Sequence, residues 1–189
     1  MSISILGGVA KGAKLATPSS HNTRPTSVLL KRRLFDSHQS FEGIEFYDIC
    51  TGSGSMGIEA MSRGAEKVIF VESNQKALGI AKKNCQELKK KYPLEAETQF
   101  IKSDAIKFLK QMQEGEGEKV LFFDPPYESK DLYIALGELL RERPKLFTKI
   151  IVEFCRQKTA PEKEVQEWLG KPDKSYRQGT SFLYIYDLN

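Results

Sequence analysis

The sequence predicts an α/β fold whose central sheet has seven mostly parallel strands and ends in an antiparallel hairpin. After residue 44, short runs of β-branched and aromatic residues alternate with longer segments in which apolar residues recur at helical spacing. This alternation is typical of a parallel sheet that helices cover on both faces, because a parallel connection has to cross over the sheet. The last two strand-like runs have only Gly179 between them, so they must pair antiparallel.

Each element of this core has a local signal. Apolar runs predict strands at residues 45–50, 67–72, 97–103, 119–124 and 149–154. Helical periodicity follows each run and predicts helices at residues 55–64, 75–92, 105–113, 131–143 and 162–169. Gly64 is expected to end the first helix, Asn74 and Asp104 to cap the next two, and Pro161 to begin the last. The closing hairpin is expected at residues 174–178 and 180–188.

The first forty residues have a different character. Residues 2–6 and 13–16 flank a glycine-rich turn and predict a small β-hairpin. A helix is expected at residues 28–38, with Thr26 or Ser27 as its cap. The net charge of these forty residues is +5, whereas the whole chain carries +4. A basic N-terminal segment on an otherwise near-neutral chain indicates a polyanionic partner. On charge alone, a solvated helix face explains this charge distribution equally well.

The composition favours a globular protein of a reducing compartment. Of the 189 residues 40% are hydrophobic and 29% charged, and no apolar run is long enough to span a membrane. The start lacks the pattern of a secretion signal. Three scattered cysteines argue against a disulfide framework, and His21 and His38 lack partners at metal-ligand spacing. We therefore expect one cytoplasmic domain over residues 1–189, with a basic extension at 1–40, a catalytic core at 41–189 and no metal.

A glycine loop follows the first central strand. Gly52, Gly54 and Gly57 satisfy the spacing G-x-G-x-x-G, and Glu72 ends the next strand 20 residues after Gly52. Such glycines let the backbone approach a ligand, and an acid at this spacing binds ribose hydroxyls. This pattern fits NAD and S-adenosylmethionine alike, and a strand–helix turn without a ligand also remains open. The antiparallel strand expected at the end of the sheet favours a methyltransferase over a dinucleotide enzyme.

The stretch Asp124-Pro125-Pro126-Tyr127 ends the fourth strand of the repeating pattern. An exocyclic amine of a base is a weak nucleophile, because its lone pair is delocalised into the ring. Acceptors that hydrogen-bond its N–H groups hold it toward an electrophile. Asp124 offers a carboxylate, Pro125 a carbonyl on a restricted backbone, and Tyr127 a face on which a base can stack. A paired base would have to be flipped out to reach them. The alternative is that the two prolines only end a strand and have no catalytic role.

With these motifs the chain resembles the bacterial small-subunit ribosomal RNA guanine-N(2) methyltransferases of the RsmD type, over nearly its whole length. The similar segments are ILGGVAKGAKL, RPTSVLLKRRLFD, DICTGSGSMGIEAMSRGAEKVIFVE, DPPY and YRQGTSFLYIY. The resemblance implies a Rossmann-like fold that uses S-adenosylmethionine to methylate the 2-amino group of one guanine in 16S rRNA. Cys50 and Thr51 replace the usual Phe-Ala pair, which we interpret as a packing difference.

The resemblance and the motifs together predict three groups of site residues. The catalytic group is Asp124, Pro125, Pro126 and Tyr127. The cofactor-binding group is Asp48, Gly52, Ser53, Gly54, Glu72, Ser73, Asp104 and Ala105. The RNA-binding group is Lys11, Lys14, Arg24, Lys31, Arg32 and Arg33. The expected partner is 16S rRNA, alone or within an assembling small subunit, and the expected state is a monomer.

Three alternatives stay open at this point. The same tetrapeptide chemistry serves enzymes that methylate the 6-amino group of adenine in DNA or a glutamine amide, although those more often carry Asn in place of Asp124. Many of the DNA enzymes also add a recognition domain, for which this chain has no room. The glycine spacing by itself supports an NAD-dependent oxidoreductase. The basic N-terminal segment by itself supports an RNA-binding module without catalysis.

Overall fold

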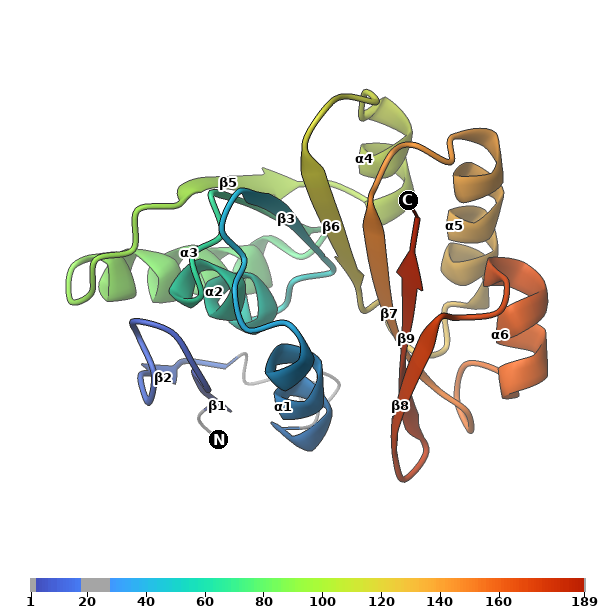
Figure 1. The fold of residues 1–189 in the computed structure, drawn as a ribbon, viewed down its shortest axis with the longest axis horizontal. Coiled ribbons are helices and arrows are strands. Elements are labelled where there is room, and N and C mark those ends of the chain that lie inside the picture. The colour runs from blue at the N-terminus through green and yellow to red at the C-terminus, as the bar shows by residue number, and fades with distance from the viewer. Residues whose placement is uncertain (1–2, 18–27, 189) are drawn as a thin grey trace.

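The structure, a computed structural model, describes residues 3–17 and 28–188 and has a seven-stranded sheet at its centre (Figure 1). The strand order is β5-β4-β3-β6-β7-β9-β8. The strands are β3 (Ile44–Ile49), β4 (Lys67–Glu72), β5 (Glu97–Lys102), β6 (Glu118–Phe123), β7 (Lys149–Cys155), β8 (Lys174–Gln178) and β9 (Ser181–Asp187). Strands β3 to β7 pair in parallel, and β9 lies antiparallel between β7 and β8. The predicted sheet is therefore confirmed.

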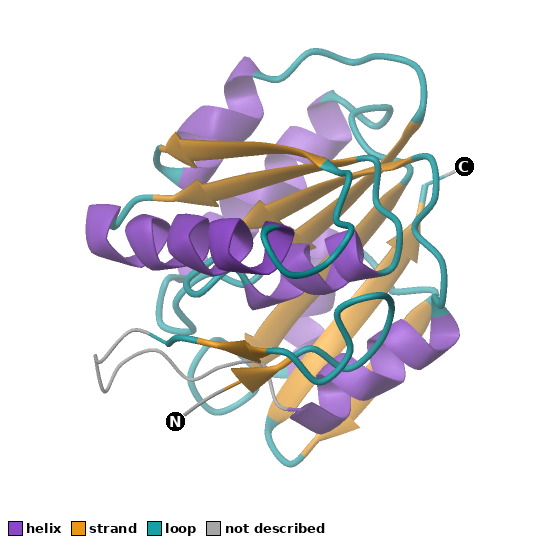
Figure 2. Cartoon of the chain, turned by 90° about the vertical axis from the view of Figure 1, so that its left-hand side faces the viewer, coloured by secondary structure: helices purple, strands orange, loops and turns teal. Residues whose placement is uncertain are grey.

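Helices cover both faces of the sheet (Figure 2). The buried residues of α1 (Val28–Ser37), α2 (Ser55–Ser62) and α3 (Gln75–Lys89) belong to the core of one face. Those of α4 (Ala105–Gln111), α5 (Lys130–Glu142) and α6 (Glu162–Leu169) belong to the core of the other. Among the described residues, no helix has the length and apolar character needed to cross a bilayer.

The inner strands β4, β6 and β7 are largely apolar because both of their faces are buried, whereas the edge strands β5 and β8 are more polar and more exposed. In β4, Val68 and Phe70 belong to the α1–α3 core, whereas Ile69 and Val71 belong to the α4–α6 core. Alternate residues of a strand point to opposite faces, so a strand between two helical layers needs apolar side chains at nearly every position. The continuous runs in the sequence follow from this layering.

The N-terminal segment packs on α2 as a small two-stranded sheet, β1 (Ile3–Ser4) with β2 (Lys14–Leu15). Ser62 at the end of α2 holds its turn, because the Ser62 hydroxyl accepts from the Ala10 N–H at 2.9 Å and donates to the Gly7 carbonyl at 2.6 Å. The proposed caps of α1, Thr26 and Ser27, lie outside the described residues.

The last hairpin is slightly shorter than expected. Its loop contains two residues, Gly179 and Thr180, rather than Gly179 alone, and β9 begins at Ser181 opposite Gln178. Gly179 has a φ of 59°, a left-handed conformation that suits glycine in a two-residue hairpin loop.

The strand order reverses between β3 and β6. The chain proceeds from β3 outward through β4 to β5, and then returns to place β6 on the other side of β3. The two strands are in register with Ile49 opposite Phe123. Loops that follow the carboxyl ends of strands at such a switch point form a crevice, which is where ligands bind in open α/β sheets.

Candidate active site

The loop that follows β3 is built from glycines with different tasks. Gly52 and Gly54 have φ values of 54° and 79°, so both occupy the left-handed region. A Cβ atom at Gly52 would meet nothing within 4 Å, which leaves the backbone there open to a ligand. At Gly57 a Cβ atom would instead overlap the Phe70 ring and lie 2.8 Å from Val68 Cγ1, so this glycine lets α2 pack closely on β4.

Asp48 fixes the conformation of this loop through two hydrogen bonds. Its carboxylate Oδ2 accepts from the Thr51 hydroxyl at 2.6 Å and from the Gly57 N–H at 2.9 Å, and its side chain is buried. Burial raises the pKa of Asp48 to about 7, and these hydrogen bonds oppose the shift. Thr51 is therefore more than a packing residue, which corrects the interpretation made from sequence.

Cys50 sits between Asp48 and this loop in a backbone conformation unusual for its type. It is the one non-glycine residue of the described chain with a positive φ, which is 63°. Burial raises the pKa of its thiol, and the charges of Glu72, Asp124, Asp48 and Asp104 raise it further. These four acids come from different strand ends, so they converge on one place.

Glu72 ends β4 beside the glycine loop, as expected. Its Oε2 accepts from the Gly52 N–H at 3.1 Å and its Oε1 from the Asn74 N–H at 2.9 Å. The predicted neighbour Ser73 is exposed and donates to the same carboxylate at 3.4 Å. The acid is thus held against Gly52, the glycine of this loop that has open space beside it.

The remaining predicted cofactor residues lie at two further places around this edge. Asp104 is exposed and caps α4 by accepting from the Lys107 N–H at 2.9 Å, while Ala105 is buried behind it. Ser53 is buried in the glycine loop, and its carbonyl accepts from the Asn84 side chain at 2.9 Å.

The stretch Asp124–Tyr127 leaves β6 next to the glycine loop. The Asp124 N–H donates to the Ile49 carbonyl at 3.3 Å, which ties the stretch to the end of β3. The Pro126 carbonyl accepts from the Ser129 N–H at 2.8 Å and closes a turn. Pro125 is buried, whereas Asp124 and Tyr127 are partly exposed. The acid and the aromatic ring are therefore both accessible at the carboxyl edge of the sheet.

Sequence reasoning missed one residue of this site, Glu153 in β7. Its side chain is fully buried, and its Oε1 accepts from the Tyr127 hydroxyl at 2.7 Å. Burial raises the pKa of Asp124, followed by the charges of Glu153 and then Asp48. The sequence did hold a signal, because an acid inside the otherwise apolar run at residues 150–155 is rarely buried in a doubly covered strand without a specific partner.

The predicted RNA-binding residues separate into two kinds. Lys11, Lys14, Arg32 and Arg33 are exposed, and Arg24 lies outside the described residues. Lys31 is wrong as a phosphate contact, since it is only 2% exposed. Its Nζ lies 3.2 Å from Glu59 Oε2 and donates to the Ser55 carbonyl at 2.8 Å, so it fixes α1 to α2 instead.

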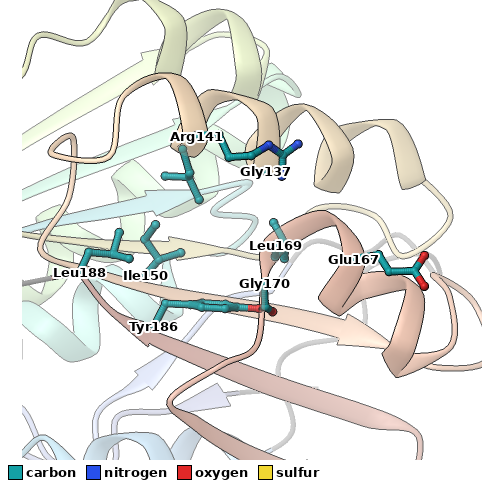
Figure 3. Close-up of a pocket in the computed structure, with 9 residues that line it drawn as sticks. Gly137, Arg141, Ile150, Glu167, Leu169, Gly170, Tyr186 and Leu188 are labelled. Carbon is teal, nitrogen blue, oxygen red and sulfur yellow. The ribbon is translucent and has the colours of Figure 1, made fainter.

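A separate cavity of about 320 Å³ lies at the opposite edge of the sheet (Figure 3). Ile150 near the start of β7 and Leu188 just after β9 line it, together with residues of α5 and α6. Its wall is mostly apolar and has none of the converging acids. We therefore place the candidate site at the carboxyl edge, where no three side chains of the described residues are positioned to hold a metal ion.

Comparison with known proteins adds a family and several relatives. The family model described as "Conserved hypothetical protein 95" matches residues 3–187. YlbH of Bacillus subtilis is 34% identical over 84% of this chain and 85% of its own. Ribosomal RNA small subunit methyltransferase D of Haemophilus influenzae is 37% identical over 66% of this chain and 64% of its own.

Solved structures agree with the fold. The yhhF protein of Escherichia coli matches with a TM-score of 0.70 and 25% identity over 98% of this chain and 97% of its own. The 16S rRNA N2 methyltransferase RsmC of Thermus thermophilus, solved with AdoMet and guanosine, has a TM-score of 0.70 and covers 99% of this chain with 49% of its own. At 16% identity this second likeness concerns the fold alone.

Proposed function

Because the chain belongs to the "Conserved hypothetical protein 95" family, that of the ribosomal RNA small subunit methyltransferases D, we propose that it methylates the exocyclic 2-amino group of a guanine in 16S rRNA. The broader activity is that of an S-adenosylmethionine-dependent ribosomal RNA methyltransferase. The choice of the guanine amine is the finer step, and it depends on the Asp124–Tyr127 stretch.

The residues of the carboxyl edge fit S-adenosylmethionine. When bound, this cofactor supplies an electrophilic methyl group on a positively charged sulfonium. The open backbone at Gly52 would give the methionine part room, and Glu72 beside it would accept from ribose hydroxyls. Asp104 and Ala105 would lie at the adenine end. The convergence of Asp48, Glu72, Asp104 and Asp124 around Cys50 suits a cationic group.

The single observation that carries the proposal is the position of Asp124. It follows β6 at the switch point, tied to the end of β3, and is close enough to Asp48 and the buried Glu153 for both charges to raise its pKa. There its carboxyl and the Pro125 carbonyl can accept from the two N–H groups of an amine and hold that amine toward the cofactor side. Tyr127, fixed through its hydroxyl by Glu153, offers its ring to the base.

Methyl transfer to the amine requires no strong base. Once the methyl group is bonded to nitrogen, the ammonium product is acidic and releases its proton to water or to Asp124. The protein's contribution is therefore to orient the amine and to stabilise the charge that develops on it.

The test uses purified protein, tritiated S-adenosylmethionine and transcribed 16S rRNA, followed by digestion and mass spectrometry of the nucleosides. We expect N2-methylguanosine as the labelled product. A label on the 6-amino group of adenosine would replace guanine with adenine as the target and leave the methyltransferase activity standing. Absence of any label in RNA, with transfer to protein instead, would overturn the proposal.

A further inference from the structure

Four basic residues connect the turn at Tyr127 with α1 through a series of neighbouring contacts. They are Arg33, Arg156, Lys158 and Arg177, and we call them the basic strip. All four are exposed. Three of them lie outside the N-terminal forty residues, where the sequence placed the RNA contacts. The chain beyond residue 40 has a net charge of −1, so its net charge does not reveal this cluster.

The strip begins at the proposed catalytic turn. Lys158 Nζ lies 3.6 Å from Glu128 Oε1, and Glu128 directly follows Tyr127. Both side chains are largely exposed, at 60% and 80%, so this ion pair contributes little to stability. Lys158 belongs to the segment after β7, the strand that carries Glu153. Its positive charge therefore lies against the residue that follows Tyr127.

The strip continues through the β8–β9 loop to α1. The Arg156 N–H donates to the Thr180 carbonyl at 2.8 Å, which joins the segment after β7 to that loop. Arg177 lies with its guanidinium 5.4 Å above the Phe182 ring and donates through Nε to the Gly179 carbonyl at 3.0 Å. Arg33 donates to the Arg177 carbonyl at 2.9 Å. Figure 1 shows α1 and the β8–β9 loop at the same end of the sheet.

We propose that the basic strip binds the phosphate backbone of the RNA substrate and so leads the strand over the rim to Tyr127; this proposal rests on the proposed function. The charge arrangement supports it. The crevice itself is lined by acids, which suit a cationic cofactor but repel a polyanion. An RNA strand therefore needs positive charge on the rim, close to the turn where its base enters. The contacts of Arg177 and Arg33 with nearby backbone hold their positions in advance of binding.

The test compares two triple variants that lose the same charge. The strip variant is Arg156→Gln, Lys158→Gln, Arg177→Gln. The control variant is Lys90→Gln, Lys91→Gln, Lys145→Gln, which changes exposed lysines after α3 and before β7, at the opposite edge of the sheet. Glutamine keeps most of each side-chain stem. Affinity for a short fluorescein-labelled single-stranded RNA is measured by anisotropy at several KCl concentrations.

Each phosphate contact with a single strand contributes about 0.7 to the slope of log affinity against log salt, so the strip variant should lose about 2 from that slope. The control variant should keep the wild-type slope. S-adenosylmethionine affinity and the urea midpoint should stay unchanged in both variants, which separates lost phosphate contacts from damage to the fold or to the cofactor site.

Equal slopes for the strip variant and the wild type would overturn the proposal, and so would equal losses in both variants, which would indicate diffuse electrostatic attraction. Failure of the proposed function shows elsewhere, as a wild-type protein that transfers no methyl group to 16S rRNA. The slopes are measured without any methyl transfer, so they decide the role of the strip in either case.

Discussion

The hydrogen bond between the Tyr127 hydroxyl and Glu153 changes the effect that we expect from removing this hydroxyl. From sequence alone Tyr127 is a stacking ring, and its hydroxyl has no assigned task. In the structure that hydroxyl donates to a fully buried carboxylate at 2.7 Å. Removing one partner of a buried hydrogen bond costs more than the bond itself contributes, and most when the partner is charged.

We therefore expect Tyr127→Phe to lower the free energy of unfolding by about 1–3 kcal/mol and to slow methylation, although the ring is kept. Tyr176→Phe on β8 is the matched control, because the described residues include no partner for the Tyr176 hydroxyl and the change should be close to neutral. Urea unfolding and single-turnover methylation measure both effects. A Tyr127→Phe protein as stable and as active as the control would contradict the role given to Glu153.

Asp48 makes the free energy of unfolding depend on pH. Its pKa of about 7 in the folded protein lies above its ordinary value of 3.8, mainly because of burial. Between these two values the folded protein keeps a proton that the unfolded chain has lost. The stability that Asp48 contributes therefore falls as the pH rises through this window.

Asp48→Asn keeps a carbonyl acceptor for Gly57 and Thr51 but does not ionise. From pH 5 to pH 7 the unfolding free energy of the wild type should fall relative to that of Asp48→Asn, at up to about 1.4 kcal/mol per pH unit. Urea titrations at pH 5, 6 and 7 give this difference directly. A difference that stays constant over the range would show that Asp48 is ionised in the folded protein well below neutral pH.

The elements were predictable because each is specified locally. Apolar runs set the strands, and Asn74 and Asp104 cap α3 and α4 as expected, through bonds to the N–H groups of Lys76 and Lys107. The positions of the proposed site residues also follow, since the ends of parallel strands meet at one edge. Their proposed roles in binding and catalysis stay predictions.

Side-chain partners between distant elements could not be predicted. Lys31 looks like one more surface charge of a basic helix, and only packing against α2 brings it to Glu59. The same holds for Asn84, a polar residue on a charged helix, which is in fact buried. Local periodicity predicts neither the Lys31–Glu59 contact nor the burial of Asn84, because both depend on how the N-terminal segment packs on the core.

Asn84 joins the N-terminal segment to the glycine loop. Its Oδ1 accepts from the Ala16 N–H, and its Nδ2 donates to the carbonyls of Ala16 and Ser53, each at 2.9 Å. The side chain is 3% exposed, so these backbone groups have little access to water. One amide thus connects the extension that precedes α1 with the loop proposed to hold the cofactor.

Asn84→Ala should destabilise the protein by about 2–4 kcal/mol, because it leaves several buried polar groups unsatisfied. Hydrogen exchange should accelerate at residues 14–17 and 51–55, while the amides of β6 and β7 keep their order of protection. Gln86→Ala, on the exposed face of the same helix, serves as the control. Unchanged exchange at both segments would show that the extension is held without Asn84.

Acidic and basic residues occupy different regions of the molecule. Acids gather at the carboxyl edge of the sheet, where the charges of Glu72, Asp124, Asp48 and Asp104 all raise the pKa of Cys50. Basic residues lie on the exposed hairpin, on α1 and along the basic strip. A cationic cofactor and a polyanionic substrate can then bind side by side, each in a region of opposite charge.

This sorting predicts a pH-dependent preference for the charged cofactor. The raised pKa values of Asp48 and Asp124 mean that a nearby sulfonium favours their ionised forms, so S-adenosylmethionine should bind about three- to tenfold more tightly at pH 8 than at pH 6. S-adenosylhomocysteine lacks that charge and should change less. Calorimetry at both pH values measures the ratio of the two dissociation constants. A ratio that does not change with pH would contradict the electrostatic role of these acids.

If Asp124 holds the reacting amine, single-turnover methylation of 16S rRNA by Asp124→Ala should reveal that role. Calorimetry should show S-adenosylmethionine still bound, while the rate falls by the equivalent of about 2.7–4 kcal/mol, the scale for losing one preorganised polar contact. Asp124→Asn keeps a carbonyl acceptor and should retain more of the rate than Asp124→Ala. If Asp124→Ala methylates RNA at the wild-type rate, the stretch from Asp124 to Tyr127 is only a turn, and Asp124 does not hold the amine.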